Sequence, residues 1–332
     1  MSKLAASEGG IAQREMLQRQ GELILKLDEI CREIRSSKGT IQKKNELLMS
    51  FLNDESKGLS KFAPLALPIE PGIFAEGICS EKCSIFKSQL NPFKVVFKGN
   101  EEYSVIFKVG DDLRQDQLIV QMIKLMDRLM KNENLDLKLT PYKVLATGLD
   151  QGMVQFVKSY TLSSILADYN NNLQLFLKTF NTDLNSPSTF FIAPIAMDNY
   201  VRSCAGYCVI TYLLGVGDRH LDNLLLTPAG NLFHIDFGFI LGRDPKPFPP
   251  PMKLCKEMVE AMGGATSVHY QKFKSFCFIA FNILRKHANL ILNLFSLMID
   301  ANIRDIAIEP DKAISKVSFS LISRFKINFV LI

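Results

Sequence analysis

The sequence lacks the long apolar segments that mark membrane and secreted proteins. No window reaches the roughly 18 uninterrupted apolar residues that a spanning helix needs. The opening residues, MSKLAASEGG, contain no apolar core of the kind that a secretion signal carries. We therefore expect a soluble, cytoplasmic protein.

Common nucleotide-binding and nucleic-acid-binding signatures are also missing. The pattern GxxxxGK[ST] does not occur, and Gly215-Val216-Gly217 lacks the third glycine of a dinucleotide fingerprint. The net charge is only +5, from 39 Lys and Arg against 34 Asp and Glu, and no lysine-rich arm is present. These absences exclude a P-loop NTPase and argue against nucleic acid as a partner.

Cysteine is too sparse for a disulfide framework. The chain has 7 cysteines, and an odd number without a secretion signal favours reduced thiols. Cys79 with Cys83, and Cys204 with Cys208, have one residue more between them than the usual zinc-knuckle spacing. We expect buried thiols, with a metal site as the less favoured alternative.

The chain has enough apolar residues for a large core. Its 332 residues are 47% hydrophobic, which suits one large domain or two ordinary ones. Apolar residues at helical spacing predict two helices at the start, over Leu17–Ile34 and Ile41–Leu52. Residues 57–71 contain several prolines and glycines and predict a linker, with a domain boundary near Pro68.

The next segment predicts a small, β-rich lobe. Alternating apolar residues indicate strands at Phe93–Lys98 and Tyr103–Val109 with a Gly99-Asn100 turn between them. A helix is expected over Asp116–Lys131, followed by strands at Tyr142–Thr147 and Met153–Val157. From Thr161 onward the pattern is mostly helical, so we expect an α+β protein with a larger helical second lobe.

Residues 215–238, GVGDRHLDNLLLTPAGNLFHIDFG, are the most informative part of the sequence. Two short apolar runs, Leu224–Thr227 and Leu232–Ile235, predict a hairpin that brings Asn223 and Asp236 side by side. Mg²⁺ takes a few protein oxygens and completes its shell with water and nucleotide phosphates. We therefore interpret Asn223 and Asp236 as metal ligands of a phosphoryl-transfer site.

The same stretch offers a general base. Asp218 and His220 share a loop, and either could take the proton of an acceptor hydroxyl as the phosphate arrives. We favour His220 as the base, with Asp218 orienting it. His234 is expected to be a packing residue, and His269 and His287 are given no role.

A nucleotide site also needs a cation on the phosphates. Lys108 ends an otherwise apolar strand, and Asp116 begins the next helix. This pair suits a lysine that contacts phosphate and a carboxylate that holds the lysine. The alternative is an exposed lysine at a sheet edge.

Three stretches resemble the phosphatidylinositol 3-kinase superfamily: FKVGDDLRQD (107–116), GVGDRHLDN (215–223) and HIDFG (234–238). The order Asp-Arg-His separates them from ordinary protein kinases. LDLKLTPYKVLAT (135–147) and FILGRDPKPFPPPMKL (239–254) are most similar to the class III, vacuolar-sorting branch. The resemblance covers about residues 68–316. It implies a bilobal, protein-kinase-like catalytic domain there, with the end of a helical domain and a linker at 1–67.

The resemblance also implies roles for individual residues. Residues 83–89 would form the loop that covers the phosphates, with Ser84 and Lys87 near ATP. Tyr142 would line the inner pocket, while Gln155, Phe156 and Val157 would form the hinge that binds adenine through its backbone. By the same resemblance, residues 216–224 are the catalytic loop and residues 235–256 are the activation loop that contacts the lipid headgroup.

The charge of the activation loop bears on the substrate. Each additional phosphate on inositol needs Lys or Arg to meet its charge. Between Asp236 and Leu254 the only cations are Arg243, Lys246 and Lys253, spread through a proline-rich loop. Unphosphorylated phosphatidylinositol is the better match, although the prolines alone would also shape an ordinary surface loop.

Taken together, the resemblance implies an ATP-dependent kinase that phosphorylates the inositol 3-hydroxyl of phosphatidylinositol, with Mg²⁺ or alternatively Mn²⁺. It implies peripheral association with endosomal or autophagic membranes, and roles in vesicle trafficking and autophagy. Regulatory subunits of the family type, a vacuolar-sorting pseudokinase and a Beclin-type protein, are the expected protein partners. The missing N-terminal C2 and helical regions would remove contacts to them.

Residues 317–332 do not follow the family pattern. We expect a divergent tail there, in place of the amphipathic helices that close the catalytic loop in the family. Two further hypotheses stay open: a catalytically silent ATP-binding or interaction module, and a protein kinase of the same superfamily.

Overall fold

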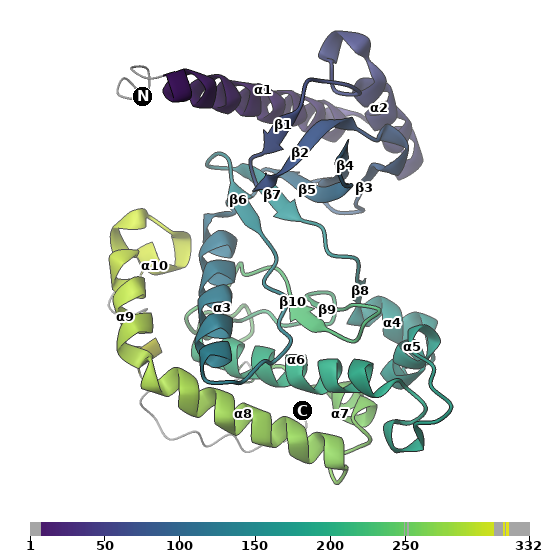
Figure 1. Ribbon diagram of the computed structural model, residues 1–332, viewed down its shortest axis with the longest axis vertical. Coiled ribbons are helices and arrows are strands. Elements are labelled where there is room, and N and C mark those ends of the chain that lie inside the picture. Colours follow the sequence, from purple (N-terminus) through teal and green to yellow (C-terminus); the bar gives the residue numbers. More distant parts are fainter. Residues whose placement is uncertain (1–7, 249, 251, 309–314, 316, 319–332) are drawn as a thin grey trace. The chain divides into compact units, whose positions relative to one another are not determined.

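The structure, a computed structural model, describes residues 8–248, 250, 252–308, 315, 317 and 318 (Figure 1). The chain divides into two compact units. One comprises residues 1–117 and 142–157, and the other comprises residues 118–141 and 158–332. The first is rich in strands and the second is mostly helical, which confirms the predicted α+β class.

An antiparallel sheet forms the centre of the first unit. Its strand order is β1-β2-β4-β5-β7-β6, and β3 pairs with β4. The predicted hairpin is confirmed, because Phe97 of β4 lies opposite Tyr103 of β5. The strands are β1 (Leu65–Leu67), β2 (Glu70–Ile78), β3 (Ser84–Ile85), β4 (Phe93–Gly99), β5 (Tyr103–Val109), β6 (Val144–Ala146) and β7 (Gln151–Gln155).

Two helices, α1 (Glu8–Ser36) and α2 (Ile41–Asn53), pack on this sheet as the apolar spacing predicts. The hydroxyl of Thr40 caps α2 by accepting a hydrogen bond from Lys43 N at 3.4 Å. Apolar side chains of both helices share one core with the strands, including Leu27, Ile30 and Leu48 with Phe93, Val95 and Phe107. The burial of this apolar surface holds helices and sheet together.

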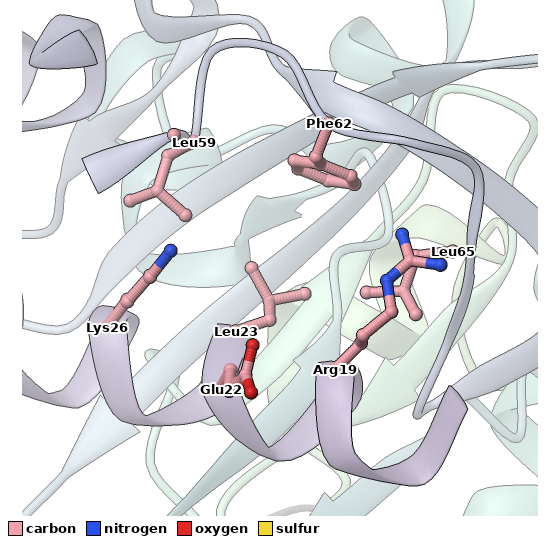
Figure 2. Close-up of a pocket in the computed structure, with 8 residues that line it drawn as sticks. Arg19, Glu22, Leu23, Lys26, Leu59, Phe62 and Leu65 are labelled. Carbon is pink, nitrogen blue, oxygen red and sulfur yellow. The ribbon is translucent and has the colours of Figure 1, made fainter. Parts of the chain in front are cut away.

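The linker predicted at residues 57–71 is not found. Its central residues form β1, which pairs with β2, and Figure 2 shows Leu59, Phe62 and Leu65 beside Leu23 of α1. Lys26 Nζ donates to Lys57 O at 2.7 Å, so α1 is bonded to the segment. The prolines flank β1 and do not interrupt it, which is why their clustering was misinterpreted.

The expected division at Pro68 therefore falls inside one sheet, between β1 and β2. The described residues before it do not form a separate compact unit. Their assignment to the end of a helical domain stays a prediction. The expected tail, 317–332, lies outside the described residues except for 317 and 318.

The second unit is built around α6 (Pro194–Leu213), which is buried along most of its length. A helix that is apolar on all sides needs neighbours on all sides. Figure 1 shows α6 between the β9–β10 hairpin and α8, both of which it contacts. The other elements are β8 (Tyr160–Thr161), α4 (Leu162–Asp168), α5 (Leu173–Phe180), β9 (Leu224–Leu226), β10 (Leu232–His234), α7 (Lys256–Ala261), α8 (Val268–Lys286), α9 (Ala288–Leu297) and α10 (Arg304–Ile308).

The helix predicted over Asp116–Lys131 is α3 (Arg114–Asn132), which crosses the division between the units. Short 3-10 turns complete the described elements, at η2 (Glu55–Lys57), η3 (Ser80–Lys82), η4 (Pro187–Thr189) and η5 (Ile299–Ala301). The strand predicted at Met153–Val157 begins earlier, at Gln151. Gly152 pairs with Lys108, and a Cβ at Gly152 would lie 2.4 Å from Leu145 O, so glycine is required for this pairing.

The cysteines are free thiols, and six of the seven are buried. Burial raises the pKa of the Cys31 and Cys83 thiols to about 11, and that of Cys208 to about 12. Cys79 alone is half-buried. In the part of the chain that the structure describes, no three His, Cys, Asp or Glu side chains gather as metal ligands.

We predict that the folded protein reacts rapidly with a thiol reagent such as Ellman's reagent at one cysteine, Cys79, because the thiolate is the nucleophile and the buried thiols are protonated and inaccessible. The Cys79→Ser variant should lose the fast phase of the reaction. In urea, every thiol of each protein should react. A fast phase that persists in Cys79→Ser would contradict the burial of the other six.

Candidate active site

The β9–β10 hairpin positions the two expected metal ligands. Its register pairs Leu224 with His234, and Ile235 N donates to Asn223 O at 3.1 Å. Asn223, the residue before β9, therefore lies opposite Ile235, the residue before Asp236. The sequence-based prediction that the hairpin brings these two residues to one end is confirmed by this register.

The side chains of Asn223 and Asp236 are held in defined orientations. Asn223 is buried, and its Nδ2 donates to Asp218 O at 3.0 Å, which identifies Oδ1 as the acceptor atom of this amide. Asp236 is exposed, and its Oδ1 accepts from Gly238 N at 3.2 Å. One amide oxygen and one carboxylate are donors that suit a hard divalent cation.

Both aspartates of the site have left-handed backbone conformations. Asp218 has φ 51° and Asp236 has φ 61°. Non-glycine residues rarely adopt such angles, and residues held in them occur often at functional sites.

Arg219 connects the two loops and was given no role from the sequence. Its side chain is 8% exposed. Nε donates to Gly217 O and Nη1 to Ile235 O, each at 2.8 Å, and Nη2 donates to Asp236 O. The guanidinium thereby ties the loop before β9 to the segment after β10. The signal available in the sequence was the Asp-Arg-His order itself, in which the arginine lies between two site residues.

His220 lies between two carboxylates. Its Nε2 is 4.0 Å from Asp218 Oδ2, and its Nδ1 is 3.7 Å from Asp222 Oδ2. The backbone N of Asp222 is 3.3 Å from the same Nδ1. Asp222 is thus as well placed as Asp218 to orient the ring, and sequence reasoning did not consider it. Because the Asp222 N–H donates to Nδ1, this nitrogen is the acceptor, and the proton of the neutral ring is on Nε2, on the Asp218 side.

The start of the activation loop pairs with the catalytic loop along its backbone. Gly217 N donates to Phe239 O at 2.9 Å, Leu241 N to Leu214 O at 2.9 Å, and Gly242 N to Gly215 O at 2.8 Å. Asp218 N donates to Asp244 Oδ2 at 2.8 Å. A Cβ at Gly217 would lie 2.1 Å from Arg243 O, so only glycine allows this close approach.

The three cations expected at the lipid headgroup have different surroundings. Lys246 is exposed, and Lys253 is half-buried. Arg243 Nη1 lies 3.1 Å from Oδ1 of the buried Asp305. The activation loop as a whole is described except at residues 249 and 251.

In the first unit, Lys108 is the residue before the last in β5 and lies opposite Gly152 of β7. Its Nζ lies 3.3 Å from Asp111 Oδ2. Asp116, the carboxylate expected to hold this lysine, lies in the first turn of α3. Asp111 is a contact of Lys108 that sequence reasoning missed.

The expected phosphate-covering residues lie in and after β3. Ser84 is exposed and opposite Lys94. Lys87 follows β3 and lines a surface hollow of about 310 Å³ with Gly39, Ile41, Lys44, Ser88 and Asn91. This hollow is next to the start of α2, a neighbour that the sequence did not indicate.

The expected inner-pocket and hinge residues lie before β6 and at and after the end of β7, and the Phe156 ring is 6.4 Å from that of Phe86, the residue after β3. Tyr142 is buried. Gln155 N donates to Lys143 O at 2.8 Å, and Phe156 N donates to Ser104 O at 2.9 Å. These two N–H groups are used within the sheet, so an adenine contact here would need other groups of the segment 155–157.

His234 is a packing residue, as expected. It is 1% exposed and stacks on Tyr207 at 5.1 Å with an interplanar angle of 5°. Burial lowers its pKa well below the usual value, with a further contribution from the charge of Arg219. The ring is therefore neutral in the folded protein.

Comparisons with known proteins agree with the geometry of these loops. A model of the family described as phosphatidylinositol 3- and 4-kinase matches residues 102–308, which is more than half of the chain. The chain is 54% identical over 324 residues to the root isoform of phosphatidylinositol 3-kinase from Glycine max. It is 53% identical over 317 residues to phosphatidylinositol 3-kinase VPS34 from Saccharomyces cerevisiae, and 54% identical over 314 residues to VPS34 from Arabidopsis thaliana.

These similarities cover 96%, 95% and 93% of this chain, respectively. They extend beyond residues 68–316 and include most of residues 1–67. The same matches cover 39%, 35% and 38% of the relatives, so the chain spans about two fifths of the length of these curated relatives. Among the described residues, no helix is both long and apolar enough to cross a bilayer.

Proposed function

Because the chain belongs to the phosphatidylinositol 3- and 4-kinase family, we propose that it transfers the γ-phosphoryl group of ATP to the 3-hydroxyl of phosphatidylinositol. The observation that carries this proposal is the hairpin end at which Asn223 and Asp236 meet, with Arg219 bonded to both flanking loops. The three relatives described above are named phosphatidylinositol 3-kinases, which supports the 3-hydroxyl as the acceptor.

The metal ligands in this proposal are Asn223 Oδ1 and the Asp236 carboxylate. A divalent cation bound there, Mg²⁺ or alternatively Mn²⁺, would neutralise charge that develops on the transferred phosphoryl oxygens. Asn223 is oriented through its bond to Asp218 O, and the backbone of Asp236 is held by Arg219. Groups that hydrogen bonds orient in advance lower the cost of reaching the transition state.

His220 takes the proton of the inositol hydroxyl in this mechanism. Its Nε2 lies on the side of Asp218, and a carboxylate beside each ring nitrogen stabilises the imidazolium that forms. The Asp222 N–H bonded to Nδ1 and the Asp218 carboxylate next to Nε2 hold the ring in its orientation. We thus assign orientation to Asp222 as well as to Asp218.

Lys108 contacts the phosphates of ATP in this proposal, and Asp116 and Asp111 hold the lysine. We predict that Lys108→Ala raises KM for ATP about tenfold or more, since a cation on the phosphates is lost while the metal ligands remain. Steady-state kinetics at varied ATP concentration test this, with the exposed Lys124→Ala as the control. An unchanged KM and kcat in Lys108→Ala would remove Lys108 from the nucleotide site.

The activation loop favours a lipid over a peptide substrate. Its Phe248 side chain is 94% exposed, next to prolines and two residues after the exposed Lys246. An exposed aromatic side chain beside a cation suits the interface of an anionic bilayer, where the ring enters the headgroup region. We propose peripheral association with endosomal or autophagic membranes, and family-type regulatory subunits as partners of the longer protein.

The experiment that tests the function measures phosphate transfer from radiolabelled ATP with Mg²⁺. The acceptors are phosphatidylinositol vesicles, soluble short-chain phosphatidylinositol and a generic kinase peptide, with Asp236→Asn as the inactive control. We expect 3-phosphorylated product from the soluble lipid at least. Product from the peptide alone would support the protein-kinase alternative, and ATP binding without any product would support the silent module.

A further inference from the structure

The short helix α10 contacts the segment that follows Asp236. Asp305 is 3% exposed, and its Oδ2 accepts a hydrogen bond from Ile240 N at 2.9 Å. Its Oδ1 lies 3.1 Å from Arg243 Nη1 and 3.5 Å from Arg304 Nε. Arg304 Nη2 also donates to Gly238 O. Two residues of α10 are thus bonded to three residues of a segment that lies more than sixty positions earlier in the sequence.

This segment is bonded to the catalytic loop as well. Phe239 O and the N–H groups of Leu241 and Gly242 pair with Gly217, Leu214 and Gly215, respectively. Residues 238–244 therefore lie between the catalytic loop and α10, with hydrogen bonds to both. A displacement of this segment would move Asp244, which accepts a hydrogen bond from Asp218 N, and Gly238, whose N–H donates to Asp236.

The charge of Asp305 explains why Arg243 is at this position. A buried carboxylate is costly unless cations and N–H donors compensate it. Arg243 supplies an ion pair, and its own side chain is 41% exposed. An arginine held by a buried carboxylate is a weaker candidate for a direct contact to the lipid headgroup, although its side chain reaches solvent.

From these contacts we infer that Asp305 and Arg243 are positioning residues: the α10 carboxylate holds the start of the activation loop against the catalytic loop, and Arg243 serves that contact in place of binding the headgroup. This inference rests on the proposed function for its kinetic consequence only. The contact itself can be tested without turnover.

The experiment compares Asp305→Asn, Arg243→Gln and the double variant with the wild type. Asp300→Asn, an exposed carboxylate in the turn before α10, is the matched control. The first measurement is hydrogen exchange of the peptides that cover residues 238–244, which requires no activity. The second is kcat, KM for ATP and KM for soluble phosphatidylinositol.

We expect the hydrogen-exchange rate at residues 238–244 to rise about tenfold or more in Asp305→Asn. The rate should also rise measurably in Arg243→Gln and should not change in Asp300→Asn. Both variants should lower kcat about tenfold or more, with KM for the lipid within twofold, because small misplacements of site residues are costly. The double variant should be no slower than Asp305→Asn, since both changes break one contact.

Three results would overturn the inference. The first is unchanged exchange in both single variants. The second is a normal kcat in Asp305→Asn, whatever its exchange. The third is a rise in KM for the lipid in Arg243→Gln, together with a double variant whose loss of kcat/KM is the product of the two single losses. Such independent effects would assign Arg243 to the headgroup. A wild type without lipid kinase activity would refute the proposed function, while the exchange measurement would still test the contact.

Discussion

The Asp236→Asn variant is expected to transfer phosphate at least about a thousandfold more slowly than the wild type at every ATP concentration. Asparagine keeps the size of the side chain, an oxygen that accepts from Gly238 N, and tolerance of the left-handed backbone at φ 61°. It removes the negative charge that a divalent cation needs. The loss should therefore appear in kcat, with the fold intact.

Radiolabelled phosphate transfer to soluble phosphatidylinositol, over a range of ATP and Mg²⁺ concentrations, measures this effect. Asp168→Asn is the matched control, because Asp168 is an exposed carboxylate at the end of α4 in the same unit. Circular dichroism and thermal unfolding should coincide for the three proteins. Turnover by Asp236→Asn within tenfold of the wild type would exclude Asp236 as a metal ligand.

The second large effect is expected for Arg219→Lys, which should lower kcat about a hundredfold and the free energy of unfolding by about 2–4 kcal/mol. The guanidinium donates to the carbonyl oxygens of Gly217, Ile235 and Asp236 at once. A lysine ammonium is a point charge on a flexible stem and cannot reproduce this fork. The three carbonyl groups would lose their donor, and the two loops would no longer be tied together.

Urea unfolding and steady-state kinetics on the same preparations separate the two consequences. Arg128→Lys, at an exposed position of α3, controls for the change of residue type. The change in midpoint should come without a change in the slope of the urea dependence. If Arg219→Lys keeps both wild-type stability and wild-type kcat, the three hydrogen bonds of the guanidinium contribute nothing to the site.

Local patterns predicted the elements on which the site is built. Apolar alternation identified β4 and β5, and the apolar runs around Pro228 identified the hairpin that places Asn223 near Asp236. These patterns succeed because a strand's alternation or a helix's spacing is determined by neighbours in sequence. The linker prediction failed because proline content does not distinguish a linker from a short strand flanked by prolines.

Some contacts of the site could not be predicted in this way. The bond between Lys108 and Asp111 is local, yet either Asp111 or Asp116 fits the sequence spacing. The role of Asp222 beside His220 depends on the ring orientation, which the loop backbone determines. Which acceptors the N–H groups of Gln155 and Phe156 bond depends on strand register.

The fold class, the hairpin and the chemical types of the expected ligands could be predicted from the sequence, because these follow from periodicity and from residue chemistry over short spans. The bonds of Arg219 to both loops, and the pairing of the buried Asp305 with Arg243, were found only in the folded chain. A buried charge finds its partners through long-range packing, and Asp305 lies 62 residues beyond Arg243. No local pattern encodes that proximity, since it arises when the helices of the second unit pack together.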